Sequence, residues 1–253
     1  MTDQDKKPAG TFTLICTTVL FLPCMLLSRL AAQTWINVVT IDDTTVSKHR
    51  TWYSNFIRIP GNLVLGFRRA PVKVLSTKQW HERERQLSDA TVVENKLQLA
   101  KLGGVPLSEY LSSEKSAAQK LAAINAATHS LFNFHFQHDQ SHGDASSSNV
   151  MINESPDGNL SAIWFDFDVA HRDSVPDVVG RSDDLRALFF TSKPWLTDND
   201  FARLFAGSDS PYTDDDVWKE LIKAMSNPIQ HCDIFHLAQQ KRAIHLTSEE
   251  SSI

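Results

Sequence analysis

The sequence of 253 residues predicts an α+β fold, with a β-rich part over residues 35–102 and a mostly helical part over residues 103–245. Apolar and polar residues alternate over residues 35–50 and again over 91–102, which is the period of half-buried strands. Further along, apolar residues recur at helical spacing: Ala117, Leu121, Ile124 and Leu131. A hydrophobic content of 42% is enough for a sizeable core.

The first part begins with an expected β-hairpin over residues 35–50, whose turn lies at Asp42-Asp43. Val46 and Lys48 then share one face of its second strand, because strand side chains alternate. Residues 51–75 contain Pro60-Gly61 and predict an irregular segment.

A helix is expected over residues 77–90, with Thr77 as its N-cap. Two short strands around a turn at Glu94-Asn95 complete this part. The run Gly103-Gly104-Val105-Pro106 then breaks the pattern and marks the boundary between the two parts.

In the second part, Ser112-Ser113-Glu114 is expected to open a long helix that runs to about Phe136. Two strands follow, over Asn149–Ile152 and Ala162–Asp166, joined by a turn at residues 155–158. Further helices are expected from Ser182 or Asp183 and over residues 195–245, and residues 246–253 are expected to form a flexible tail.

The N-terminal segment, residues 1–34, is strongly apolar. No charged residue lies between Lys7 and Arg29, which is close to the length that spans a bilayer. The large Leu30 at the −3 position disfavours a signal-peptide cleavage site. We therefore expect a membrane anchor that leaves the protein on the cytoplasmic side; the alternatives are a buried helix and a non-native start of the reading frame.

Charge is unevenly distributed along the chain. The formal net charge is −5, which gives no reason to expect nucleic-acid binding by the chain as a whole. Residues 44–81, however, contain seven Lys and Arg residues and no Asp or Glu. This stretch suits an anionic partner such as a membrane surface, and the alternative is a solvated basic face. Three cysteines without a metal-site spacing indicate a reducing, intracellular context.

Two polar clusters carry the chemistry. The first is His142-Gly143-Asp144 with Asn149 five residues after the aspartate, and the second is Asp166-Phe167-Asp168 at the end of an apolar strand. Phosphoryl transfer needs a carboxylate beside the attacking hydroxyl, and an amide oxygen with a second carboxylate to hold Mg²⁺. The hairpin between the clusters is expected to bring them together.

These clusters resemble the catalytic segments of atypical, protein-kinase-like enzymes. HGDASSSNVMI is similar to their catalytic loop, with His-Gly-Asp in place of His-Arg-Asp, and AIWFDFD is similar to the DFG segment that follows. The pattern resembles the small kinase subunit of the tRNA-modifying KEOPS complex and the bacterial sugar and lipopolysaccharide-core kinases. The resemblance covers roughly residues 35–190 and implies a two-lobed kinase fold.

The resemblance also implies roles for individual residues. Asp144 would be the catalytic base, and Asn149 and Asp166 the Mg²⁺ ligands. Lys48 would be the ATP-binding lysine of the third strand, with Glu84, or failing that Glu82, as its partner on the helix. The hinge against the adenine would comprise Ala100, Lys101 and Leu102. Asp184 would support the catalytic loop from below.

The sequence departs from the family at several points. A Gly-rich phosphate loop is missing, and the early hairpin offers Asp42-Asp43 instead. Asp168 replaces the glycine of DFG, and Gly143 replaces the arginine that reads a phosphorylated activation loop. Only 17 residues separate Asp166 from Asp184, which favours a small acceptor. The histidines 135, 138 and 142 lack the further ligands of a zinc site.

The sequence thus predicts a kinase that uses ATP and Mg²⁺ to phosphorylate a hydroxyl group. A saccharide or lipid-linked acceptor agrees with the apolar N-terminus and the basic stretch, and a protein Ser/Thr acceptor is the alternative. Two other functions stay open: a pseudokinase that binds nucleotide without turnover, and a partner-dependent ATPase subunit of an RNA-modifying complex. Oligomeric state is not specified by the sequence.

Overall fold

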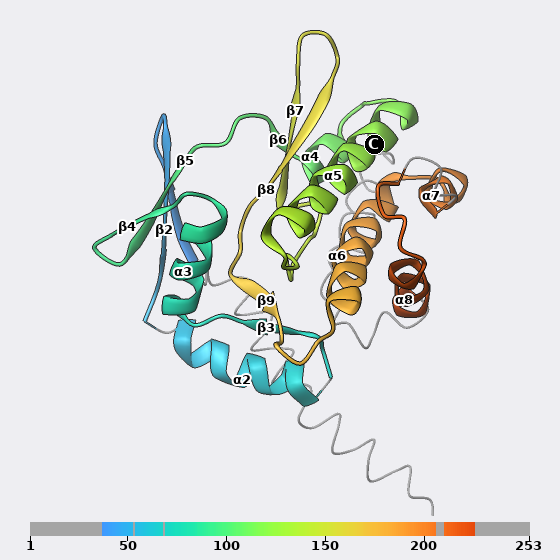
Figure 1. The fold of residues 1–253 in the computed structure, drawn as a ribbon. Coiled ribbons are helices and arrows are strands. Elements are labelled where there is room, and N and C mark those ends of the chain that lie inside the picture. The colour runs from blue at the N-terminus through green and yellow to red at the C-terminus, as the bar shows by residue number, and fades with distance from the viewer. Residues whose placement is uncertain (1–36, 53, 68, 206–209, 226–253) are drawn as a thin grey trace, which may run out of the picture.

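The computed structural model describes residues 37–52, 54–67, 69–205 and 210–225. Within these residues it contains antiparallel sheets and seven α-helices, which confirms the α+β prediction (Figure 1). The predicted apolar anchor and the predicted tail lie outside the described residues. Among the described residues, no helix is both long and apolar enough to cross a bilayer.

The strands are β1 (Asn37–Ile41), β2 (Thr45–Arg50), β3 (Val72–Val74), β4 (Thr91–Val93), β5 (Lys96–Ala100), β6 (Val105–Pro106), β7 (Val150–Glu154), β8 (Leu160–Trp164) and β9 (Val169–His171). The helices are α2 (Ser54–Phe67), α3 (Thr77–Leu87), α4 (Leu107–Ser112), α5 (Ala117–His138), α6 (Asp177–Ser192), α7 (Asp198–Phe205) and α8 (Asp215–Met225), with a 3₁₀ turn at Lys193–Trp195.

The first sheet has the strand order β1-β2-β5-β4, with every pair antiparallel. Both hairpins expected from the sequence are present, and Lys48 of β2 stands opposite Leu97 of β5. The turn at Glu94 and Asn95 places both residues in the left-handed region, as a tight two-residue hairpin turn requires. Helix α3 covers this sheet, and Trp80 and Leu97 are fully buried between them.

Helix α2 is the main correction to the sequence prediction, which expected residues 51–75 to be irregular. The helix runs through Pro60 and Gly61, two residues that weaken helices locally. The Asn62 side chain of this helix donates to the Val74 carbonyl at 2.9 Å and accepts from the Val74 N–H at 2.8 Å. This tertiary contact with β3 stabilises α2 where local propensity does not.

Two helix starts differ from expectation because of capping. The N-cap of α3 is Ser76 rather than Thr77, and Ser76 forms a reciprocal capping box with Gln79. The long helix expected to open at Ser112-Ser113-Glu114 begins later, as α5 at Ala117, after a second capping box formed by Ser116 and Gln119; Ser112 is instead the last residue of α4.

Helix α6 also begins earlier than expected. Its first residue is Asp177, after Pro176, instead of Ser182 or Asp183. Proline fixes a backbone angle that suits the start of a helix, and an acidic residue is stabilised in the first turn. The Ser182 hydroxyl instead donates to the Val178 carbonyl within the helix.

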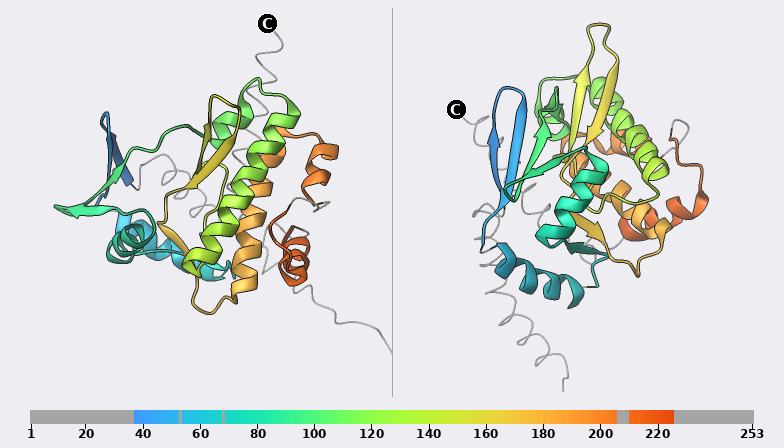
Figure 2. Two further views of the ribbon diagram at one scale, coloured as in Figure 1. Left: turned by 45° about the horizontal axis from the view of Figure 1, so that its top comes forward. Right: turned by 60° about the vertical axis from the view of Figure 1, so that its left-hand side comes forward.

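The second part of the chain has its own core, separate from the one beneath the first sheet. Helix α5 packs against the β7–β8 hairpin on one side and beside α6 on another, and α8 packs against α6 (Figure 2). Fully buried residues here include Leu107, Ile124, Leu185 and Leu188. A small sheet of β3 and β9 joins the two parts, because β3 precedes α3 in the chain whereas β9 follows β8.

Candidate active site

The loop between α5 and β7 is held in place by one buried carboxylate. Asp184 of α6 accepts the backbone N–H of His142 at 2.5 Å and that of Gly143 at 2.8 Å. Gly143 has a φ of +90°, and a Cβ there would come within 2.7 Å of Ala170 Cα. The expected support of this loop by Asp184 is confirmed.

Asp184 is itself fixed by a chain of hydrogen bonds. His135 of α5 contacts it through Nε2 at 2.8 Å, and the Tyr212 hydroxyl lies 2.8 Å from His135 Nδ1. Burial alone would raise the pKa of the Asp184 carboxyl, but the hydrogen bond from His135 and the charge of His171 hold it below its ordinary value. Asp184 therefore stays ionised and keeps accepting both loop N–H groups.

His142 orders the loop and is not free to bind a metal. Its Nδ1 accepts the Asp144 N–H at 3.3 Å, and its Nε2 lies 3.2 Å from the Phe165 carbonyl, which assigns the proton to Nε2. Burial lowers the pKa of His142 to about 4. The ring is therefore neutral near pH 7. Among the described residues no group of three His, Cys, Asp or Glu side chains could hold a metal.

Asp144 and Asn149 lie together, as the sequence predicted. The Asn149 amide nitrogen donates to the Asp144 carboxylate at 2.9 Å and to the Asp144 carbonyl at 2.8 Å. Burial, and then the nearby negative charge of Asp166, raise the pKa of the Asp144 carboxyl to about 6. The Asp144 and Asp166 carboxylates are thus close enough for their negative charges to repel each other, and a bound cation would reduce this repulsion.

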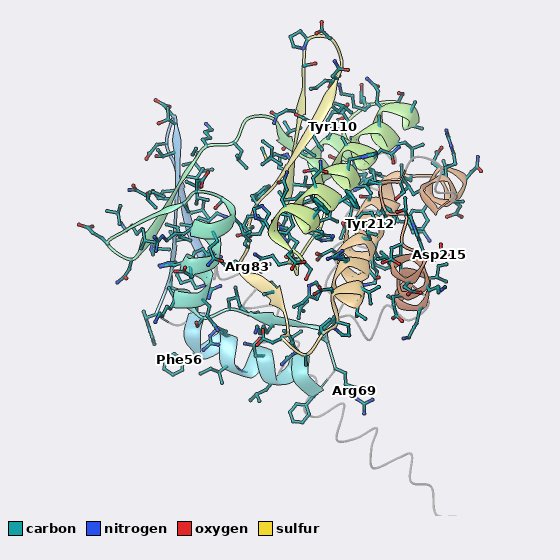
Figure 3. All side chains as sticks on the ribbon, in the orientation of Figure 1. Phe56, Arg69, Arg83, Tyr110, Tyr212 and Asp215 are labelled. Carbon is teal, nitrogen blue, oxygen red and sulfur yellow. The ribbon has the colours of Figure 1, made fainter. Side chains whose placement is uncertain are left out.

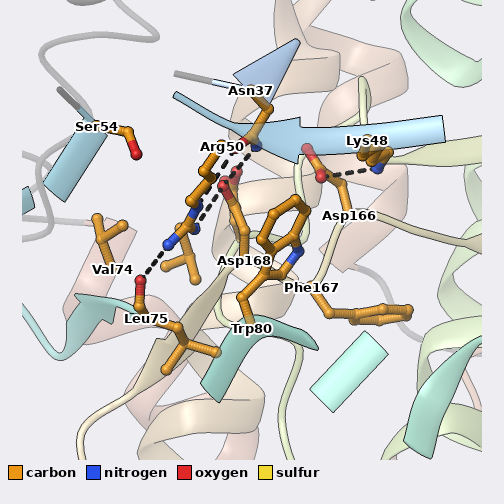
Figure 4. A network of polar contacts seen from close by, with 12 residues as sticks. Asn37, Lys48, Arg50, Ser54, Val74, Leu75, Trp80, Asp166, Phe167 and Asp168 are labelled. Atoms are coloured by element: carbon orange, nitrogen blue, oxygen red, sulfur yellow. Dashed lines mark hydrogen bonds and ion pairs between the residues drawn. The ribbon is translucent and has the colours of Figure 1, made fainter. Parts of the chain in front are cut away.

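Asp166 lies in the turn after β8, where its carboxylate contacts the Lys48 ammonium group. It has a φ of +70°, an uncommon conformation for a residue with a side chain. Its Oδ1 lies 2.9 Å from Lys48 Nζ (Figure 4). Burial would lower the pKa of Lys48, but the charges of Asp166 and Glu84 outweigh this and raise it. Strained residues of this kind cluster at functional sites.

Glu84 is in the site but does not make the expected ion pair with Lys48. Its carboxylate is fully buried and accepts the Phe167 N–H at 3.2 Å and the Ser88 hydroxyl at 2.8 Å. Lys48 meets Asp166 within ion-pair distance instead, and the charge of Glu84 still raises the pKa of Lys48, so the pairing of Lys48 with Glu84 stays a prediction. The fallback, Glu82, is exposed and faces Arg85 at 3.8 Å, away from the site.

A second pair, which the sequence analysis did not identify, lies beside the first. Arg50 is two residues after Lys48 on β2, and its guanidinium lies 3.4 Å from Asp168 (Figure 4). Asn37 of β1 donates to the same carboxylate at 3.2 Å. Burial, and then the charge of Asp166, raise the pKa of Asp168 to about 7. The sequence did contain a signal for Arg50, because Arg50 is two residues after Lys48 and therefore lies on the same face of the strand.

Arg83 is a further residue of the site that the sequence did not single out. It is buried and projects from α3 toward β9, where it donates to the carbonyl of Val169 (Figure 3). It also donates to the carbonyls of Ser141, at 2.6 Å, and His142, at 3.1 Å. Arg83 therefore ties α3 to both polar clusters.

The expected hinge, Ala100 to Leu102, forms the end of β5 and the start of the connection to β6. The Lys101 N–H is already bonded to the Thr44 carbonyl at 2.9 Å. No contact among the described residues links this stretch to Asp144 or Asp166. The adenine contact remains a prediction that depends on the other backbone groups of the stretch.

The donor set around Asp144 suits Mg²⁺ better than a softer metal. It comprises the carboxylate of Asp166 and the side-chain oxygen of Asn149, whose nitrogen is used inside the loop, with the Asp144 carboxylate nearby. Mg²⁺ prefers oxygen ligands and uses few carboxylates when phosphates and water complete its shell. The residues present therefore fit the metal.

Comparison with protein-family models finds no match for this chain, and comparison with curated proteins finds none either. The candidate site therefore rests on its geometry and on the sequence motifs.

Proposed function

We propose that this α+β protein is a two-lobed, protein-kinase-like phosphotransferase that uses ATP and Mg²⁺ to phosphorylate a hydroxyl group. The observation that supports this most is the approach of Lys48, from the first sheet, to Asp166, 118 positions further along the chain, beside the Asp144–Asn149 pair. Two separate hydrophobic cores, on either side of the connection from β5 to β6, agree with two lobes.

In this proposal each side chain has one task. Asp144 accepts the proton of the attacking hydroxyl, and its partly raised pKa keeps it close to the range useful for a general base. Asn149 and Asp166 would hold Mg²⁺, which supplies charge neutralisation at the phosphates when it is bound. Lys48 would bind a phosphate oxygen. Glu84 and Arg83 position the turn and the loop that carry these groups.

The acidic turn at Asp42-Asp43 is less of an obstacle than the sequence suggested. If Lys48 belongs to the third strand of the family's sheet, then β1 is the second strand and this turn joins strands two and three. The loop that covers the phosphates in that family would then precede Asn37. The turn itself is a simple hairpin, with the Asp42 N–H bonded to the Thr45 carbonyl.

The test is Mg²⁺-dependent ATP turnover by the full chain, comparing wild type with Asp144→Asn. Loss of a general base should lower turnover roughly a hundredfold or more. Asp157→Asn is the matched control, because Asp157 is exposed in the turn between β7 and β8 and should leave turnover unchanged. Turnover that survives Asp144→Asn would refute the assignment of the base.

A second candidate, nucleotide binding without turnover, is favoured by one observation. Lys48 is paired with Asp166 itself, and not with Glu84, so ATP and Mg²⁺ would have to displace this contact. Fluorescent ATP that binds in the presence of Mg²⁺ without any turnover would favour a pseudokinase or a partner-dependent ATPase. An absence of nucleotide binding would refute both proposals.

A further inference from the structure

Helix α2 presents a row of large apolar side chains to the outside of the molecule. They recur every three or four residues and therefore share one face of the helix and of the turn before it: Trp52, Phe56, Ile59, Leu63 and Phe67. Their exposed fractions range from 55% for Ile59 to 88% for Phe67. Phe56 projects outward from one end of the helix and Arg69 lies beyond the other (Figure 3). We call this row the α2 stripe.

The opposite face of α2 is firmly attached to the protein. Ser54 is buried, Asn62 exchanges two hydrogen bonds with Val74, and Arg172 donates to the carbonyls of Asn62 and Ala70. The helix is thus attached through Asn62 to β3 and to Arg172, the residue after β9. The α2 stripe is therefore the outward side of a fixed element and not part of the hydrophobic core.

Exposed cations accompany the α2 stripe. Residues 44–81 contain no acidic residue. Three of their basic side chains pair with aspartates elsewhere in the chain, whereas Arg69 and Lys78 are exposed. An open hollow of about 400 Å³ adjoins the C-terminal end of α2, and its lining includes Arg69, Arg172 and Ser174. The Arg172 guanidinium already donates to two carbonyls, so the Arg69 guanidinium and the Ser174 hydroxyl are the groups that suit the phosphate of a lipid headgroup.

We propose that α2 lies in the plane of an anionic membrane, with the α2 stripe in the acyl-chain boundary and Arg69 at the headgroups. An amphipathic helix with aromatic and aliphatic residues on one side and basic residues beside it binds membranes in this way. The binding does not depend on the proposed phosphotransfer. If both hold, membrane binding brings the candidate site to lipid-linked acceptors, because β3 directly follows α2 and pairs with β9, which begins after Asp168.

The first test locates Trp52 in the membrane. Full-length protein is mixed with phosphatidylcholine–phosphatidylserine vesicles whose acyl chains are brominated, and tryptophan quenching is compared between wild type, Trp52→Phe and Trp218→Phe. Trp218, on α8, is the matched control. We expect wild type and Trp218→Phe to be quenched and Trp52→Phe to lose most of the quenching. Equal quenching of wild type and Trp52→Phe would overturn the proposal.

The second test measures binding to vesicles with and without phosphatidylserine by co-sedimentation. Phe56→Ser, Leu63→Ser and Phe67→Ser are combined in one variant, which should bind anionic vesicles at least about tenfold more weakly, because each buried side chain is worth roughly that factor. Phe136→Ser is the control, since Phe136 is 81% exposed on α5. Equal binding to neutral and anionic vesicles would refute the charge argument.

Other occupants of the α2 stripe give different results. If a second copy of the chain covers it, the triple variant would change the sedimentation coefficient without lipid, and Trp52 would not be quenched by brominated lipid. That result would overturn membrane binding in favour of self-association. If residues 1–34 alone bind the membrane, the triple variant and wild type would bind equally and Trp52→Phe would leave quenching unchanged, which also overturns the proposal.

Discussion

Two basic–acidic pairs connect strand β2 to the turn after β8, and they differ in how they are built. Lys48 meets Asp166 at 2.9 Å, and the Asp166 side chain is 31% exposed. The Arg50 guanidinium lies 3.4 Å from Asp168, and the Arg50 side chain is only 2% exposed. The two pairs are two residues apart on both segments, so one register of the chain places both.

The difference lies in the surrounding contacts. Arg50 also donates to the Leu75 carbonyl and to Asn37, and its guanidinium lies 4.7 Å from the Trp80 ring. Lys48 has one carboxylate partner within ion-pair distance among the described residues, Asp166. A strongly held pair fixes the turn, whereas a lightly held, partly exposed pair can exchange its partner for a ligand. Under the proposed function, Arg50–Asp168 would hold the turn in place, and Lys48–Asp166 would be the pair that a ligand opens.

The largest expected effect is a difference in ATP turnover between variants of the two aspartates, Asp166 and Asp168. Asp166→Asn removes a proposed Mg²⁺ ligand and should lower turnover roughly a hundredfold or more. Asp168→Asn keeps the shape and a hydrogen-bonding oxygen, so turnover should stay near that of wild type. Phosphate release measures both, and circular dichroism verifies that both variants fold. Equal losses in the two variants would break the comparison.

The next effect concerns the two basic residues and the free energy of unfolding. Above about pH 7, where Asp168 is ionised in wild type, Arg50→Met leaves this carboxylate buried without its cation and should cost about 3 kcal/mol. Lys48→Met removes the partner of a more exposed carboxylate and should cost less than about 1 kcal/mol. Urea unfolding measures both values. A larger loss for Lys48→Met would show that the pairs had been assigned the wrong way round.

The pH dependence of stability sharpens the comparison further. Burial, and then the charge of Asp166, raise the folded-state pKa of Asp168 from 3.8 to about 7, so ionising this carboxyl costs the folded state free energy. Wild type should therefore lose stability relative to Asp168→Asn as the pH rises from about 4 to about 7, by up to about 3 kcal/mol. Urea unfolding at several pH values tests this. Parallel pH profiles would contradict the raised pKa.

The smallest effect comes from the residue that joins Arg50 and Asp168. Asn37 donates to Asp168 and accepts from Arg50 Nε at 3.3 Å, so Asn37→Ala should cost about 1 kcal/mol. Thr40→Ala, on the same strand but exposed, should cost less. Thermal unfolding compares the two. If Asn37→Ala has no effect, Arg50 alone holds Asp168 in place.

Much of the candidate site was predictable because its signals are local. Asp144 and Asn149 are five residues apart on one loop, and the hairpin that returns the chain to Asp166 carries its own turn sequence around Gly158. Short-range hydrogen bonds and turn geometry determine these features. The same holds for the hairpins over β1–β2 and β4–β5, whose pairing and turn positions agree with the structure, although β1 and β4 do not alternate between buried and exposed residues.

What the sequence could not supply are contacts between distant segments. Arg83 resembled a surface charge, although it lies buried against Val169 and Ser141. Glu84 was expected to meet Lys48, and its hydrogen bond from the Phe167 N–H was not expected. In each case the partner is more than 50 residues away, and no local pattern specifies which buried polar groups will meet.

By itself, then, the sequence determined the α+β class, the two hairpins of the first sheet and the Asp144–Asn149 loop, because hydrogen bonds and side-chain periodicity act over a few residues. Only the tertiary structure decided that α2 is a helix despite Pro60, that Arg50 and Asp168 form a second pair beside Lys48 and Asp166, and that the α2 stripe faces outward. These outcomes depend on which surfaces pack together. Packing involves long-range burial and pairing, whose free energies exceed the local preferences they override.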